Sequence, residues 1–168
     1  MHAFAVLDSP RARMRALPRL AWIAVGGVVF AMADLVVAAV FWGVRSGVPP
    51  IRIPQAIASW VLGGDAAHAG GMATAIAGAA LYGFVMGTIV AVFVRWHARS
   101  ARVRAAGFAG GALYGIAMYG LVFHGLVPLL SAASATGVAP PSWEFACVVT
   151  FACIGTGIAG LARFLAGR

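Results

Sequence analysis

The sequence predicts an all-α integral membrane bundle of four transmembrane helices, with a short interfacial or re-entrant helix in the first external loop. Composition gives the class: 62% of the 168 residues are hydrophobic and 10% are charged, whereas soluble domains carry about 25% charged residues. Such a composition excludes a soluble globule, a disordered chain and a disulfide-stapled secreted domain. The second observation is the presence of four long apolar runs.

Each of these runs is long enough to cross a bilayer, because about 20 apolar residues in a helix span roughly 30 Å of hydrocarbon. The runs cover residues 20–44, 72–94, 105–130 and 143–165. Prolines mark their ends: Pro18 precedes the first run, and Pro140 and Pro141 precede the last. A helix begins or stops at such positions.

The first run has a second interpretation, as a cleaved signal peptide. Leu20–Phe30 could form the apolar region of such a peptide, and Ala31-Met32-Ala33 has the small-x-small form of a cleavage site. The apolar run nevertheless continues through Leu35–Trp42. An uncleaved membrane span is therefore the simpler interpretation.

The arginines predict the orientation of the bundle. The net charge is +8, and the basic residues flank the apolar runs, which indicates membrane topology rather than nucleic-acid binding. Ten of the twelve lie before the first span, between the second and third, or near the C-terminus: Arg11, Arg13, Arg15, Arg19, Arg95, Arg99, Arg102, Arg104, Arg163 and Arg168. Cytoplasmic loops are enriched in arginine. We therefore expect a bacterial inner-membrane protein with both termini cytoplasmic and residues 1–19 as an Arg-rich arm.

The arginines between the second and third spans have a further expected role. Arg95, Arg99, Arg102 and Arg104 lie within ten residues of one another beside a predicted span. Clusters of basic residues beside a span bind anionic lipid headgroups. Membrane lipid is therefore an expected partner at this loop.

Glycines at helical spacing predict how the spans pack. They are Gly83 and Gly87 in the second span, Gly107, Gly111 and Gly115 in the third, and Gly155, Gly157 and Gly160 in the fourth. Small residues let helix backbones approach closely in lipid. Packing within one bundle is the simpler interpretation, and a face for a homo-oligomer or a partner membrane subunit is the alternative.

Tryptophans and cysteines of the spans are interpreted as structural. Trp22, Trp42, Trp96 and Trp143 lie near span ends, where indole rings anchor a helix at the membrane interface. Cys147 and Cys153 lie six residues apart in one apolar run, which predicts small core residues rather than a disulfide or a zinc site.

The first external loop is expected to contain a short helix. Ile51–Leu62 is apolar but too short to cross the membrane. A short polar turn with Asp65 and His68 follows it. These two residues could contribute two metal ligands, but an N-cap role for Asp65 and an interfacial position for His68 are the simpler interpretation, and we expect no metal site.

Asp34 is the most informative residue of the sequence. It lies roughly 21 Å from the cytoplasmic edge of the first span, at 1.5 Å of rise per residue, where a carboxylate costs about 2.5–3.5 kcal/mol to insert. His124 in the third span is expected at a similar depth. Tyr119, and Glu144 at the start of the fourth span, could extend the same polar site towards the external face.

Two interpretations of this polar group remain open. In the first, Asp34 and His124 form a protonatable pair, or a site for a small ligand or ion. In the second, a protonated Asp34 only fixes helix register through a hydrogen bond to Tyr, Thr or His. Pro128, four residues after His124, lacks the N–H that would bond to the His124 carbonyl and so leaves a backbone acceptor beside the site.

No catalytic motif is present in the sequence. It contains no GxSxG, HExxH or CxxC motif, no glycine-rich phosphate loop and no acidic pair at metal-ligand spacing. Ser59 with His68 or His124 could be imagined as nucleophile and base, but no spacing selects them. We therefore expect no enzymatic activity and no cofactor.

Several short motifs resemble those of a known set of proteins. They are the stretch Ile57-Ala58-Ser59-Trp60-Val61-Leu62-Gly63 with Asp65-Ala66 and Gly70-Gly71, then Gly110-Gly111-Ala112-Leu113-Tyr114-Gly115 and Pro128-Leu129-Leu130-Ser131-Ala132. Over residues 20–132 the chain is broadly similar to the YagU-like family of bacterial inner-membrane proteins. The resemblance implies a four-helix inner-membrane protein and no particular activity. Members of that set carry a His near Tyr82 and an amide near His124, and this chain departs from the pattern at both positions.

Taken together, the sequence predicts a small non-enzymatic multipass protein of accessory, scaffold or stress-related type. The alternative is a proton- or ion-coupled transporter of small molecules that acts as a homo-oligomer through Asp34 and His124. Four helices alone rarely enclose a path across the membrane, which is why the alternative requires several copies of the chain.

Overall fold

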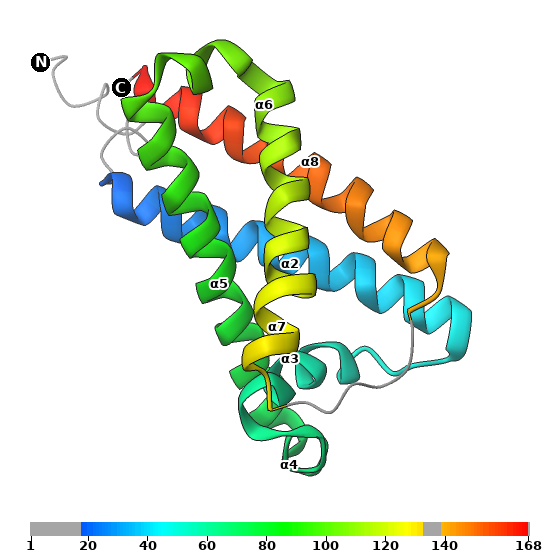
Figure 1. The fold of residues 1–168 in the computed structure, drawn as a ribbon. Coiled ribbons are helices and arrows are strands. Elements are labelled where there is room, and N and C mark those ends of the chain that lie inside the picture. Colours follow the sequence, from blue (N-terminus) through cyan, green and yellow to red (C-terminus); the bar gives the residue numbers. More distant parts are fainter. Residues whose placement is uncertain (1–17, 133–138, 168) are drawn as a thin grey trace, which may run out of the picture.

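The computed structural model describes residues 18–132 and 139–167, and this part of the chain is helical, without strands (Figure 1). Four helical segments are long and apolar enough to cross a membrane: α2 (Arg19–Ser46), α5 (Gly71–Arg99), the continuous segment Ala101–Leu130, and α8 (Pro141–Ala166). The third comprises α6 (Ala101–Tyr119), a π-helix η1 (Gly120–Leu126) and α7 (Val127–Leu130). The expected all-α membrane bundle is confirmed, whereas most of the predicted N-terminal arm, residues 1–17, lies outside the described residues.

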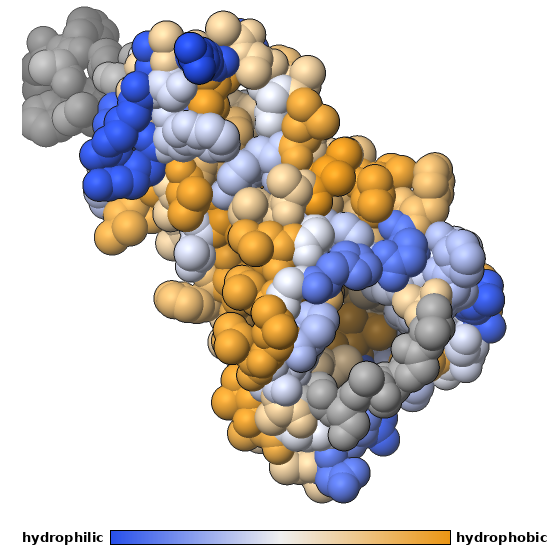
Figure 2. Space-filling view, viewed as in Figure 1, coloured by the Kyte–Doolittle hydropathy of each residue, from blue (hydrophilic) through white to orange (hydrophobic). Residues whose placement is uncertain are grey.

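The bundle has two chemically different ends. The start of α2, the end of α8 and the turn between α5 and α6 lie together at one end, and α3, α4 and α7 lie at the other (Figure 1). We call the first the arginine-rich end, after Arg19, Arg95, Arg99, Arg102, Arg104 and Arg163. Hydrophilic side chains gather there, and apolar side chains cover much of the surface between the two ends (Figure 2). Exposed residues such as Phe84, Leu113 and Phe145 belong to this apolar surface, as expected for helices that face lipid.

Glycines bring the backbones of α6 and α8 into contact. A Cβ atom added to Gly115 would lie 1.9 Å from the carbonyl oxygen of Phe151, and one added to Gly155 would lie 2.1 Å from the carbonyl oxygen of Gly111. Only glycine permits so close an approach. The predicted glycine face of the third span is therefore used within the bundle.

A second close approach joins α2 to α5. A Cβ atom added to Gly27 would lie 2.5 Å from the Cα atom of Gly87. Gly107, which the sequence groups with Gly111 and Gly115, has a different role. Its φ of 56° lies outside the helical region, and a Cβ atom there would meet no neighbour, so Gly107 bends α6 instead of packing it.

The half of the bundle towards the arginine-rich end is filled with side chains. Met86, Val90, Phe93, Ile158 and Leu165 are each at most 2% exposed. The hydroxyl of Tyr114 donates a hydrogen bond of 2.7 Å to the carbonyl of Ile89 on α5. This half of the bundle is therefore a packed core.

Two arginines complete helix ends at the arginine-rich end. Arg104 donates hydrogen bonds of 3.2 Å to the carbonyls of His97 and Ala98 in the last turn of α5. Arg19 donates one of 3.4 Å to the carbonyl of Leu165 near the end of α8. Cations are favourable at the C-terminal end of a helix dipole. Arg95, Arg99 and Arg102 are exposed.

The expected loop helix is present as α3 (Arg52–Leu62), followed by the short α4 (Gly64–Ala69). Helix α3 packs tightly on α5, since a Cβ atom added to Gly78 would lie 1.9 Å from the carbonyl oxygen of Pro54. The amide of Gln55, which is 2% exposed, donates a hydrogen bond of 2.9 Å to the carbonyl of Gly71. The carbonyl of Trp60 accepts one of 2.8 Å from the N–H of Ala132 after α7. Helix α3 is therefore bound to the bundle at both of its ends.

The expected N-cap role of Asp65 is wrong. Helix α4 is preceded by Gly63 and α5 by Gly70, and neither helix has a side-chain cap. Asp65 lies instead in the first turn of α4, where a carboxylate faces the positive end of the helix dipole.

Candidate functional site

A cavity of about 300 Å³ lies in the half of the bundle away from the arginine-rich end. Helices α2, α3, α5, α6, η1 and α8 all contribute to its wall. Asp34, Tyr119, His124 and Glu144 all line it, so the structure brings the four residues of the predicted polar site together. The surface is hollowed between the region of α3 and α7 and the start of α8, with apolar side chains in its depth (Figure 2).

Asp34 pairs with a tyrosine of α5. The hydroxyl of Tyr82 donates a hydrogen bond of 2.5 Å to Oδ2 of Asp34. Tyr82 is 1% exposed, so this contact lies at the buried end of the cavity. The direct pair of Asp34 and His124 in the first interpretation is not formed, since each residue has a different partner in the cavity. The hydrogen bond between Asp34 and a tyrosine is the kind of contact that the second interpretation names.

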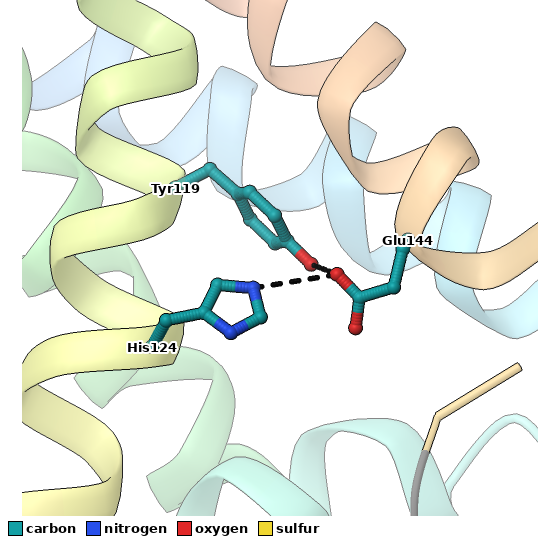
Figure 3. Close-up of polar contacts among 3 residues, drawn as sticks. All are labelled: Tyr119, His124 and Glu144. Atoms are coloured by element: carbon teal, nitrogen blue, oxygen red, sulfur yellow. Dashed lines mark hydrogen bonds and ion pairs between the residues drawn. The ribbon is translucent and has the colours of Figure 1, made fainter. Parts of the chain in front are cut away.

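His124 belongs to a second polar group with Tyr119 and Glu144 (Figure 3). The Tyr119 hydroxyl donates a hydrogen bond of 2.5 Å to Oε2 of Glu144, and Nε2 of His124 lies 3.3 Å from the same oxygen. The side chains of His124 and Glu144 are 57% and 39% exposed. This group therefore forms the open side of the cavity, whereas Asp34 and Tyr82 form its depth.

The π-helix explains why Tyr119 and His124 point in the same direction. Residues five apart diverge by about 140° on an α-helix of 3.6 residues per turn, but they lie on one face where the hydrogen bonds run over five residues. In η1 the N–H of Val127 bonds to the carbonyl of Val122, five residues earlier. Pro128, which has no N–H, follows directly and cannot extend the α-helical pattern back to His124.

Aromatic rings make up much of the cavity wall. Of the sixteen residues that line it, seven are aromatic: Trp42, Trp60, Tyr82, Tyr119, Phe123, Trp143 and Phe151. Trp42 and Trp143, predicted as interface anchors, lie 5.5 Å apart between ring centroids. Both therefore contribute to the wall of the cavity.

Three contributors to the cavity were missed by reasoning from the sequence. Trp60 on α3 lines it, and so does Cys147, which is buried in the core as predicted. Cys153, also predicted as a core residue, is exposed instead. Tyr82 was noted only as a departure from the YagU-like pattern. A tyrosine in the middle of an apolar span is itself a signal, because its hydroxyl needs a partner there.

Among the described residues, neither arginine nor lysine lines the cavity beside its two carboxyl groups. The one basic residue of this described lining is His124, whose Nε2 lies 3.3 Å from Oε2 of Glu144. Arg52 on α3 is directed elsewhere, with hydrogen bonds to Gln55 and to the carbonyl of His68. Among the described residues, side-chain hydrogen bonds use only one oxygen of each carboxylate.

The other candidate residues of the sequence, Ser59, Asp65 and His68, do not line the cavity. Within residues 18–132 and 139–167, no three His, Cys, Asp or Glu side chains gather as metal ligands would. Asp65 and His68 lie on α4 and do not line the cavity. The hydroxyl of Ser59 donates to the carbonyl of Ala56 at 2.6 Å, within its own helix.

The comparisons with known proteins add no identification to this geometry. No protein-family model matches the chain, and neither a curated protein nor a solved structure is significantly similar to it.

Proposed function

We propose that this chain is a non-enzymatic, accessory-type protein of the bacterial inner membrane that binds a small ligand in the cavity. The observation that carries the proposal is that five helical segments surround a cavity of about 300 Å³. They are α2, α3, α5, α8 and the continuous segment Ala101–Leu130, which includes α6 and η1. That volume lies at the lower end of the range for small-molecule sites, about 300–1,000 Å³. A helix pair that needed Asp34 only for register would not require such a space.

The packed half of the bundle supports binding rather than passage through a single chain. Between the cavity and the arginine-rich end lie Met86, Val90 and Phe93 of α5, all at most 1% exposed. The arginine-rich end is assigned to the cytoplasm by the excess of arginine in cytoplasmic loops. In this orientation the cavity lies towards the external side of the membrane.

Proton- or ion-coupled transport by a homo-oligomer is the second candidate function. It is favoured by the two tyrosine–carboxylate contacts and the histidine, which provide protonatable groups from the depth of the cavity to its open side. Buried protonatable groups of this kind occur in proton relays of membrane transporters. In proteoliposomes, a proton- or ion-coupled flux that is unchanged in the Asp34→Asn variant would exclude this candidate.

The ligand-binding proposal is tested by native mass spectrometry of protein gently extracted from its own membrane. The test variant is Ala38→Phe, which fills the cavity because Ala38 lines it and is 7% exposed. The matched control is Ala33→Phe, at an exposed position of the same helix. We expect a small bound species in the wild type and in the control, and its loss in Ala38→Phe. A wild-type protein carrying only lipid, with the same mass profile in both variants, would contradict the proposal.

A further inference from the structure

We propose that the ligand of the cavity is a small organic monocation, such as a protonated or quaternary amine. This inference rests on the proposed ligand-binding function and specifies its substrate class. Three properties of the cavity support it: two carboxyl groups without an arginine or lysine among the described lining residues, several aromatic ring faces, and a limited volume.

The charge of the cavity selects a cation. Asp34 lies in its depth and Glu144 at its open side, with no arginine or lysine in the lining. Each carboxyl group accepts a tyrosine hydrogen bond through one oxygen, and no described side chain donates to the other oxygen. A carboxylate in low-dielectric surroundings is stabilised by a positive partner. An anionic ligand would meet two carboxyl groups, with His124 as the one basic side chain among the described lining residues.

The aromatic walls select an organic rather than an inorganic cation. Trp42 and Trp143, whose ring centroids are 5.5 Å apart, line the same cavity as Glu144. The ring centroid of Trp60 lies 6.4 Å from that of Tyr82, the partner of Asp34. Ring faces attract alkylammonium groups through cation–π interactions. A divalent metal ion would instead require several oxygen or nitrogen ligands within direct bonding distance. The described residues provide no group of three such side chains.

The volume restricts the size of the ligand. A cavity of about 300 Å³ can hold a trimethylammonium group with a short substituent, while its rings surround the methyl groups. The side chains of Tyr119, His124 and Glu144 would then meet the polar end of the ligand at the open side (Figure 3).

The test uses three probes of equal shape and different charge. They are choline, its neutral analogue 3,3-dimethylbutan-1-ol, and the anion 3,3-dimethylbutanoate. Binding to the full-length protein in nanodiscs is followed by tryptophan fluorescence, because three of the five tryptophans line the cavity. We expect saturable binding of choline, at least tenfold tighter than that of the alcohol, and no binding of the anion.

Variants connect the binding to the two carboxylates. Asp34→Asn and Glu144→Gln are each expected to weaken choline binding about tenfold or more, since each removes one charge-assisted contact with the ligand. Asp34→Glu keeps the charge and should retain more affinity than Asp34→Asn. The matched control is Asp65→Asn, which removes a carboxylate on α4 outside the cavity and should leave affinity unchanged.

The outcomes separate this inference from the proposed function. Equal affinity for choline and the alcohol, lost in Ala38→Phe, would overturn the cation assignment and leave ligand binding intact. Choline binding that is unchanged in both charge-neutral variants, or equal in Asp34→Asn and Asp65→Asn, would also overturn it. If no probe binds and the native mass spectrum carries only lipid, both proposals fail.

Discussion

Two GxxxG motifs look alike in the sequence but have different surroundings: Gly111 and Gly115 on α6, and Gly83 and Gly87 on α5. This difference leads to a testable prediction about the contact of α6 with α8. Alanine at Gly115 places a methyl group 1.9 Å from the carbonyl oxygen of Phe151 and 3.1 Å from the Cα atom of Gly155. These neighbours are backbone atoms and cannot rotate away. Since ordinary contacts of a methyl group begin near 3.4 Å, the two helices must separate by more than an ångström.

The expected cost follows from this separation. Overpacking a close contact costs about 1–3 kcal/mol, and the higher helix propensity of alanine returns roughly 0.5–1 kcal/mol. Gly115→Ala should therefore lower the free energy of unfolding by about 1 kcal/mol, within a range of about 0–2.5 kcal/mol. In Gly87→Ala the added methyl group meets no neighbour, so this matched variant should be neutral or more stable by up to about 1 kcal/mol.

The measurement is reversible unfolding in mixed micelles of sodium dodecyl sulfate and a mild detergent, followed by circular dichroism. Both variants are compared with the wild type under the same conditions. Equal stabilities of Gly115→Ala and Gly87→Ala would refute the assignment of the α6–α8 contact. A Gly115→Ala protein more stable than Gly87→Ala would refute it more strongly.

The remaining predictions concern the cavity and the orientation. Tyr82→Phe removes the hydrogen bond to Asp34 and should lower the free energy of unfolding by about 1–3 kcal/mol; an unchanged unfolding curve would contradict this. Gly78→Ala pushes α3 away from α5, because the added methyl group would lie 1.9 Å from a carbonyl oxygen of α3; choline affinity should fall, and an unaltered affinity would show that α3 is not a required wall. In a cysteine-free background, an impermeant maleimide added to intact cells should label Ala66→Cys but not Ser100→Cys, and the reverse pattern would invert the proposed orientation.

The spans and the polar site could be predicted because each depends on local chemistry. Apolar runs identify the membrane helices, since no other segment can cross the hydrocarbon. Asp34 and His124 stand out because polar residues are costly at that depth. Their common position in one cavity follows from similar distances along neighbouring helices.

Which of these polar residues pair with one another could not be predicted, because pairing depends on rotation about the helix axes. Depth alone allowed Asp34 to meet His124, but the faces of α2 and α5 direct Asp34 to Tyr82. Similarly, a GxxxG motif does not indicate which glycine is in contact. Gly115 is enclosed by α8, whereas Gly87 approaches α2 through its Cα atom and a side chain at Gly87 would meet nothing. The close contact of Gly78 with the carbonyl oxygen of Pro54 likewise cannot be predicted from a local sequence pattern.

The π-helix η1 lets one continuous membrane segment contact two helices that lie in different directions, α8 and α3. Before η1, α6 packs on α8 through Gly111 and Gly115. After it, the chain lies beside α3, where the N–H of Ala132 bonds to the carbonyl of Trp60. The π-turn amounts to one extra residue, which rotates everything beyond it by about 100° relative to a regular α-helix. Deleting a single residue from η1 would therefore affect the two parts of this segment differently. The contact of α6 with α8 would keep its register. The part of the segment after η1 would rotate, so that its present inner face turns towards lipid.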